Sequence, residues 1–154
     1  MSPVELQIEK IRAIAELKEE TGIDFVINAR TCAYWLDVAG EEEKFEIACQ
    51  RGNAFAQAGA DCVFVPGAIG EETVKKLAEN IEAPLNIILN GKFNDLKKLE
   101  KAGVRRLSTG SGPARYIYGN TVEIARELRC GKTEQILSGW LSYNEANEYF
   151  KDQI

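Results

Sequence analysis

Short apolar runs alternate with segments of helical periodicity along most of the chain, and this alternation constrains the fold more than any other feature of the sequence. The apolar runs predict strands over 24–29, 61–65, 84–89 and 104–108. The periodic segments predict helices over 4–18, 41–58, 71–79, 94–102 and 113–129, with one or two more over 133–150. Continuous apolar runs are typical of strands buried on both faces of a parallel sheet. Strands that alternate with helices over short loops therefore predict an α/β fold of parallel βα units.

Two architectures fit this order of elements. One is a small doubly wound open sheet, and the other is a piece of a (β/α)8 barrel, which takes about 250 residues when complete. With 154 residues, four βα units would make half of such a barrel. We expect residues 1–131 to form the four units with a preceding helix, and residues 132–154 to form a helical extension. In either architecture the functional side chains gather at the carboxyl ends of the strands.

The composition excludes several classes of function. The chain has no histidine, which removes histidine-based triads, imidazole bases and histidine-ligated zinc. Its four cysteines include no Cys-x-x-Cys pair, so we expect no structural zinc site. A net charge of −5 argues against nucleic acid as a partner. The sequence has no apolar run long enough for a membrane span and no secretory signal, so we expect a cytoplasmic protein with reduced thiols.

The turn after the last predicted strand has the composition of an anion-binding loop. It reads Ser108-Thr109-Gly110-Ser111-Gly112-Pro113. Glycines let a backbone approach a ligand closely, and the unpaired N–H groups of a helix N-terminus attract anions. Arg115 lies one turn inside the following helix and adds a positive charge. We expect Gly110, Ser111, Gly112 and Arg115 to bind an anionic group of a substrate. A tight turn that requires glycine is the alternative.

Arg30 directly follows the first predicted strand, at the edge where functional side chains meet. A guanidinium in this place is suited to bind a carboxylate or a phosphate through two parallel hydrogen bonds. The alternative is an ion pair with a neighbouring carboxylate such as Asp61. Cys32 lies two residues further on, and a thiol near an arginine can be reactive. Because no base stands beside it in the sequence, an inert thiol is the favoured interpretation.

Several segments together resemble one enzyme superfamily. Ala29-Arg30-Thr31-Cys32-Ala33 resembles the Ala-Arg-Thr-Asp-Ala signature of the isocitrate lyase/phosphoenolpyruvate mutase superfamily. Further similar segments occur in the same order as in that superfamily, at 10–13, 58–67, 103–108 and 112–115. The resemblance runs over residues 5 to 131. It is strongest to the group of 2-methylisocitrate lyases, oxaloacetate decarboxylases and phosphonopyruvate hydrolases.

The resemblance implies a (β/α)8 barrel of which this chain supplies strands five to eight, the C-terminal half. Superfamily members require magnesium and break or rearrange C–C or P–C bonds beside a 2-oxo acid, through an enolate held by the metal. The resemblance further implies that Arg30 and Arg115 bind substrate carboxylates and that Asn86, in the neighbouring loop, also binds the substrate. It also implies oligomers that exchange the C-terminal helix, a part that residues 133–154 could play.

The chain departs from the superfamily pattern where the metal and the acid–base chemistry are concerned. It contains neither the Asp-x-Asp motif of the metal ligands nor the Cys-Gly-His motif of the catalytic loop. Cys32 occupies the place of the signature aspartate, and Val65-Pro66 the place of an expected glutamate. We therefore expect no catalytic residue and no metal ligand in this chain, with the magnesium that the superfamily implies bound elsewhere.

These observations predict part of a magnesium-dependent lyase or mutase for a 2-oxo or 2-hydroxy di- or tricarboxylate, inactive by itself. A non-catalytic domain that binds a small acid or phosphate, or that serves in assembly, is the alternative. A third hypothesis is an independent open α/β fold that binds a phosphorylated metabolite. Half a barrel would leave its first and last strands as open edges, so we expect homo-oligomers or pairing with a complementary N-terminal half.

Overall fold

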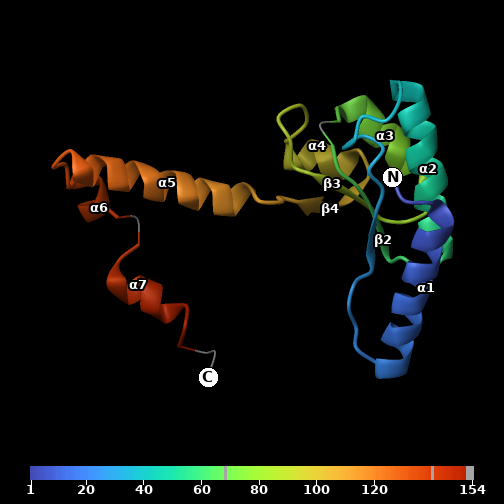
Figure 1. The fold of residues 1–154 in the computed structure, drawn as a ribbon, viewed down its shortest axis with the longest axis horizontal. Helices are drawn as coiled ribbons and strands as arrows, with labels where there is room; N and C mark the ends of the chain where they lie inside the picture. The colour runs from blue at the N-terminus through green and yellow to red at the C-terminus, as the bar shows by residue number, and fades with distance from the viewer. Residues whose placement is uncertain (68, 140, 152–154) are drawn as a thin grey trace. The chain divides into compact units, whose positions relative to one another are not determined.

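The computed structural model of the protein describes residues 1–67, 69–139 and 141–151. The chain divides into two compact units, Met1–Gly110 and Ser111–Ile154. Within the described residues, the first unit contains four strands and four helices, and the second contains three helices (Figure 1). None of the described helices is both long enough and apolar enough to cross a membrane.

The four strands of the first unit are parallel and lie in the sheet in the order in which they occur in the sequence. They are β1 (Asn28–Arg30), β2 (Cys62–Val65), β3 (Leu85–Ile88) and β4 (Val104–Ser108). The helices that alternate with them are α1 (Val4–Thr21), α2 (Glu41–Gln57), α3 (Glu71–Asn80) and α4 (Leu96–Lys101). The predicted alternation of strands and helices is confirmed.

The first strand is shorter than the sequence predicted, beginning at Asn28 instead of residue 24. Its ladder starts where its neighbour starts, with Asn28 opposite Cys62. Just before that point the Ile27 N–H donates to the carboxylate of Asp61 at 2.7 Å instead of to a strand. The apolar residues before Asn28 therefore continue along the sheet edge without a ladder of their own. Arg30 is the last residue of β1, not the first residue after it.

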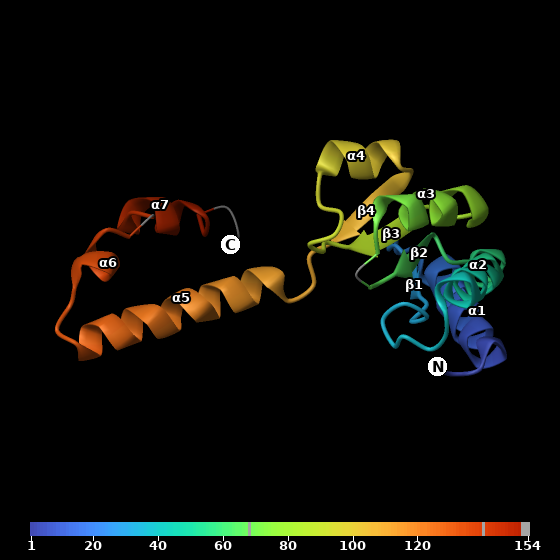
Figure 2. The same ribbon diagram turned by 90° about the horizontal axis from the view of Figure 1, so that it is seen from above.

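One face of the sheet carries the hydrophobic core. Ala48 of α2, Val74 and Leu77 of α3 and Leu99 of α4 pack against buried residues of the strands. The strand residues in this core include Val63, Val65, Leu85, Ile87 and Val104. Figure 2 shows α2, α3 and α4 along the same side of the sheet. A doubly wound sheet reverses its strand order and carries helices on both faces. That alternative is wrong, and the arrangement is that of a segment of a (β/α) barrel.

The other face of the sheet carries polar side chains. One register row crosses all four strands, with Arg30 opposite Phe64, Phe64 opposite Asn86, and Asn86 opposite Arg106. Residues level with one another in a parallel sheet point to the same face. This row therefore lies on the face that the helices leave uncovered, which in a closed barrel is the interior. We call Arg30, Asn86 and Arg106, the three polar members of this row, the polar row.

The second unit consists of α5 (Gly112–Arg129), α6 (Glu134–Leu137) and α7 (Tyr143–Glu148). The predicted long helix is confirmed, and the one or two further helices predicted over 133–150 are two, α6 and α7. No side chain of α5 is buried, and Tyr116, Ile117 and Tyr118 are each more than half exposed. The N-terminus of α7 is closed by a capping box in which Ser142 and Glu145 bond each other's backbone. The predicted extension over 132–154 includes positions 140 and 152–154, which lie outside the described residues.

Candidate functional site

Arg30 lies at the carboxyl end of β1 with its guanidinium held by neighbours that carry no charge. Its Nε–H donates to the Cys32 sulfur at 3.1 Å. Its central carbon lies 5.4 Å from the centre of the Trp35 ring and 5.9 Å from that of Phe64. Among the described residues, none of the ion pairs includes Arg30. The guanidinium packs against two aromatic rings, and its hydrogen-bond acceptor is a thiol, which is a weak one. It is therefore well suited to bind an anion.

The alternative partner suggested for Arg30 is wrong, because Asp61 is engaged elsewhere. Its carboxylate accepts the Ile27 N–H at 2.7 Å and the Lys18 ammonium at 3.0 Å. The backbone bond from Ile27, followed by the bond from Lys18, lowers the pKa of Asp61. This carboxylate precedes β2, at the amino end of the sheet, where it fixes the start of β1. Its function is structural.

The lowered pKa of Asp61 predicts a stability difference that depends on pH. Because the folded state favours the ionised carboxylate, its contribution is complete above the ordinary pKa and is lost as the pH falls through the lower, folded-state value. Asp61→Asn is therefore expected to destabilise the protein by roughly 1 kcal/mol at pH 7, reduced by its partial exposure. The difference in the free energy of unfolding between Asp61→Asn and wild type is expected to become smaller as the pH falls below the ordinary pKa of an aspartate. Urea unfolding from pH 7 to pH 3 measures this difference.

Asp24→Asn is the matched control for this experiment. Asp24 lies 3.8 Å from the same Lys18 ammonium, but its side chain is 99% exposed. The control should match wild type at every pH, because exposed ion pairs contribute little. If the free energy of unfolding of Asp61→Asn differs from that of wild type by the same amount down to pH 3, ionisation of Asp61 does not contribute to stability.

Asn86 is fully buried in β3, in the polar row, and not in a neighbouring loop as the resemblance implied. Its amide nitrogen donates to the Ser108 hydroxyl at 3.0 Å, and that hydroxyl donates back to the amide oxygen at 3.2 Å. Arg106 is the next member of the row, across on β4. The structure therefore brings Arg30 and Asn86 to one face of the sheet. Arg106 and Ser108 are polar neighbours that were not among the predicted site residues.

The predicted anion-binding turn spans the boundary between the two units. Gly110, with a φ of +58°, closes the first unit, and Ser111, Gly112 and Arg115 open the second. A Cβ at Gly110 would lie 3.2 Å from the Cδ1 atom of Ile88, so a side chain there is both strained and crowded. Ser111 precedes α5 without capping it through its side chain. The first N–H groups of α5 are therefore free of a side-chain cap, as an anion site requires.

The loop after Arg30 is fixed by a buried lysine. The Lys44 ammonium lies 2.7 Å from an oxygen of Asp37 and 2.5 Å from one of Glu41, and its side chain is only 8% exposed. These two bonds, that from Asp37 first, raise the pKa of Lys44, and the bond from Lys44 lowers the pKa of Asp37. Asp37 is held at a φ of +49°. The lysine thereby anchors the loop that places Trp35 over Arg30.

The described residues do not bring together a metal site. No three side chains of Cys, Asp or Glu among them could jointly hold an ion. Magnesium takes its ligands from several converging oxygens, mostly carboxylates and water. The residues present therefore do not fit the magnesium that the resemblance implies. The four cysteines are free thiols, and burial raises the pKa of Cys49 and Cys62.

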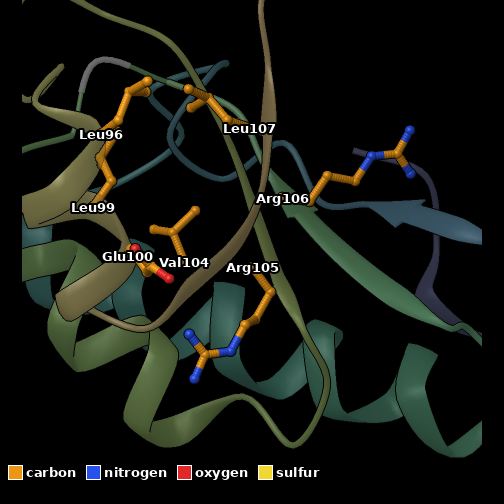
Figure 3. Close-up of a pocket in the computed structure, with 7 residues that line it drawn as sticks. All are labelled: Leu96, Leu99, Glu100, Val104, Arg105, Arg106 and Leu107. Carbon is orange, nitrogen blue, oxygen red and sulfur yellow. The ribbon is translucent and has the colours of Figure 1, made fainter.

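Both edges of the sheet are bordered by hollows. Beside β1, a cavity of about 370 Å³ is lined by Ile11 and Ile14 of α1 and by Phe25, Val26 and Ile27 among others. Beside β4, a cavity of about 280 Å³ lies against α4. Figure 3 shows Leu96, Leu99, Val104 and Leu107 on the α4 side of β4, while Arg106 points to the opposite side of the strand. Hollows that expose apolar side chains beside unpaired strand edges are typical of surfaces that another element covers.

The chain is similar to known proteins in both sequence and structure. A family model described as phosphoenolpyruvate phosphomutase matches residues 1–129. Oxaloacetate decarboxylase of Pseudomonas fluorescens is 32% identical over 111 residues, which cover 71% of this chain and 35% of that protein. The chain thus spans about a third of the length of this curated relative.

Two solved structures show the same fold. Phosphonopyruvate hydrolase superposes with a TM-score of 0.72 at 21% identity, over 99% of this chain and 54% of that one. Oxaloacetate acetylhydrolase in complex with oxalate superposes with a TM-score of 0.70 at 24% identity, over 84% of this chain and 44% of that one. This chain therefore matches about half of each of these larger α/β proteins.

Proposed function

Because this chain belongs to the phosphoenolpyruvate phosphomutase family, we propose that it is part of a magnesium-dependent lyase or mutase that acts on a 2-oxo or 2-hydroxy di- or tricarboxylate. The observation that carries this proposal is Arg30, a guanidinium at the carboxyl end of β1 without a carboxylate partner among the described residues. Substrates of this class are anions at neutral pH. A guanidinium in that position binds one of their carboxylates through two hydrogen bonds.

We further propose that residues 1–131 are the C-terminal half of a (β/α)8 barrel. Four features support this: the sequential strand order, the helices on one face, the polar row on the other, and two open edges beside cavities with apolar residues in their lining. The solved relatives are about twice as long as the part that this chain matches. In the complete barrel a complementary N-terminal half would cover both edges. Residues 132–154 would form an extension exchanged between subunits.

The residues of this chain would bind and orient the substrate. Arg30 would hold a carboxylate of the substrate. As the resemblance implies, Arg115 would also bind a carboxylate, and the turn of Gly110, Ser111 and Gly112 would bind an anionic group. Asn86 is committed to Ser108, so it would keep the polar row rigid beneath the substrate. Cleavage next to a 2-oxo group builds negative charge that must be stabilised in place. Since the described residues do not form a metal site, that stabilisation would come from outside them.

A non-catalytic domain that binds a small acid or takes part in assembly is the second candidate. It is favoured by one observation, the lack of a metal-binding cluster in the described parts of the chain. Both candidates use the same anion-binding side chains. They differ in whether turnover appears when an acid-rich N-terminal half is supplied.

The proposed carboxylate ligands predict a loss of oxalate binding on substitution. Arg30→Ala and Arg115→Ala are each expected to weaken oxalate binding by about tenfold or more, the effect of losing a charged two-bond contact. Isothermal titration calorimetry measures the affinity. Arg12→Ala, which removes an exposed arginine from the middle of α1, should leave it unchanged. Unchanged affinity in both site variants would reject their assigned roles.

Magnesium is expected to leave the stability of the isolated chain unchanged. A ligand raises the melting temperature only where the folded state offers it a site. The described residues offer no such cluster. Thermal unfolding with and without millimolar magnesium chloride, against sodium chloride of equal ionic strength, measures the difference. A rise of several degrees specific to magnesium would mean that this chain binds the ion by itself.

A further inference from the structure

A small pocket lies at the open edge of β1, close to the start of α1. Its volume is about 230 Å³. The lining consists of Met1 and Ser2, Gln7 of α1, Arg30 at the end of β1, Cys32 and Leu36 of the following loop, and Arg51 of α2. Pockets for drug-sized molecules measure about 300–1,000 Å³. A hollow of this size suits a small ion or a single functional group of a larger molecule.

The pocket brings two positive charges together without a negative one. None of its lining residues is an aspartate or a glutamate. The ion pairs of the described residues include neither Arg30 nor Arg51. The whole chain carries a net charge of −5, so this local excess of positive charge runs against its composition.

Arg51 is the member of this pair that has no other evident function. Its guanidinium packs 5.3 Å from the Phe55 ring. Its Nε–H is buried and has no acceptor among the described residues. Buried donors in proteins are nearly always paired. The Arg51 side chain lines the pocket, so an anion that enters it would give this guanidinium an acceptor.

We propose that this pocket binds a small oxyanion, a carboxylate or a phosphate group, held between Arg30 and Arg51. The inference rests on the proposed function only through Arg30, which is assigned there to a substrate carboxylate. Arg51 is the new ligand. It would give the site a second guanidinium, approaching the anion from α2 while Arg30 approaches it from β1.

Cys32 leaves the pocket without a negative charge of its own. Its sulfur accepts the Arg30 Nε–H at 3.1 Å, but a thiol is a weak acceptor. A carboxylate on residue 32 would stand within reach of Arg30 and would take the place of an external anion. Cys32→Asp is therefore expected to fill the pocket from within. Cys32→Ser, similar in size and neutral, is expected to leave it open.

Binding of inorganic phosphate and of oxalate to the full chain, each followed by isothermal titration calorimetry, tests the proposal. We expect wild type and Cys32→Ser to bind at least one of the two anions. Arg51→Gln and Cys32→Asp should each bind that anion about tenfold more weakly or worse. Cys32→Asp should also melt at a higher temperature than wild type when no anion is present. Arg51→Lys keeps the charge and the packing against Phe55 but loses the planar fork, so it should fall between wild type and Arg51→Gln.

The outcomes separate this proposal from the proposed function. If Arg30→Ala loses oxalate binding while Arg51→Gln and Cys32→Asp retain it, the two-arginine pocket is overturned and the role of Arg30 stands. If Arg51→Gln and Cys32→Asp lose phosphate binding while oxalate binding depends on Arg30 alone, the pocket is supported as a phosphate site distinct from the carboxylate contact. If wild type binds neither anion, both proposals are overturned.

Discussion

Leu77→Ala is expected to lower the free energy of unfolding by about 3 kcal/mol or more, a large part of the stability of a domain of this size. Leu77 is fully buried on α3, in the core cluster that also contains Leu85 and Ile87. Removal of its side chain leaves a cavity, because the hydrogen-bonded strands beneath α3 cannot move far enough to fill it. Urea unfolding followed by far-UV circular dichroism measures the loss.

Leu17→Ala is the matched control, because Leu17 also lies on a long helix but is 51% exposed. Its expected cost is within about 1 kcal/mol. Equal losses in the two variants would mean that the helix-covered face of the sheet is not the core. A Leu77→Ala loss below that of the control would lead to the same conclusion.

Val26→Lys is expected to weaken self-association of the isolated chain by about tenfold or more. Val26 is 60% exposed and lines the apolar cavity beside β1, together with Ile14 and Phe25. A lysine at this position places a charge on the strand edge. A strand or helix of a second chain that covered this edge would have to bury that charge. Natural proteins protect edge strands against pairing in the same way.

The dissociation constant from dilution calorimetry measures this effect. Val38→Lys serves as the control, because Val38 is 42% exposed but lies in the loop before α2, away from the cavity beside β1. If the two variants associate alike, the edge of β1 is not the surface that the chain covers.

The sequence was sufficient to predict a parallel sheet of four strands that alternate with helices, although it placed the start of β1 four residues too early. The apolar runs of β2 and β3 are followed by turns that contain glycine or proline, and α3 buries Val74 and Leu77 on one face, so local pattern and global packing agree there. Arg30 could be singled out because it directly follows such a run. The order of the strands, and the fact that the helices cover one face of the sheet, could not be predicted from the sequence. The doubly wound sheet and the (β/α)8 barrel are built from the same βα units.

The polar row could not be predicted by assigning alternate residues of each strand to opposite faces of the sheet. On β4 the register shifts, so that Val104 lies opposite Leu85 while Arg106 lies opposite Asn86. This extra residue puts Val104 and Leu107 toward the same side although they are an odd number of positions apart. An alternating pattern would place one of them on the wrong face. Arg106 consequently resembles one more surface cation in the sequence.

Long-range contacts decide the remaining features. Lys44 belongs to a run of charged residues that is typical of a solvated helix face, yet it is buried because Asp37 and Glu41 bond it. The start of β1 depends on Asp61, more than thirty residues away in sequence. Arg51 meets Arg30 and Cys32 only through the packing of α2 beside β1. None of these pairings has a local signature, because each is made by tertiary structure.

Sedimentation velocity of the isolated chain, over a range of micromolar concentrations, tests most directly whether this sheet is one side of a larger barrel. Two unpaired strand edges beside apolar cavities should be covered in solution. We therefore expect association, with a weight-average mass that rises with concentration above the 17.1 kDa of one chain. A single compact species of 17.1 kDa at every concentration would contradict it.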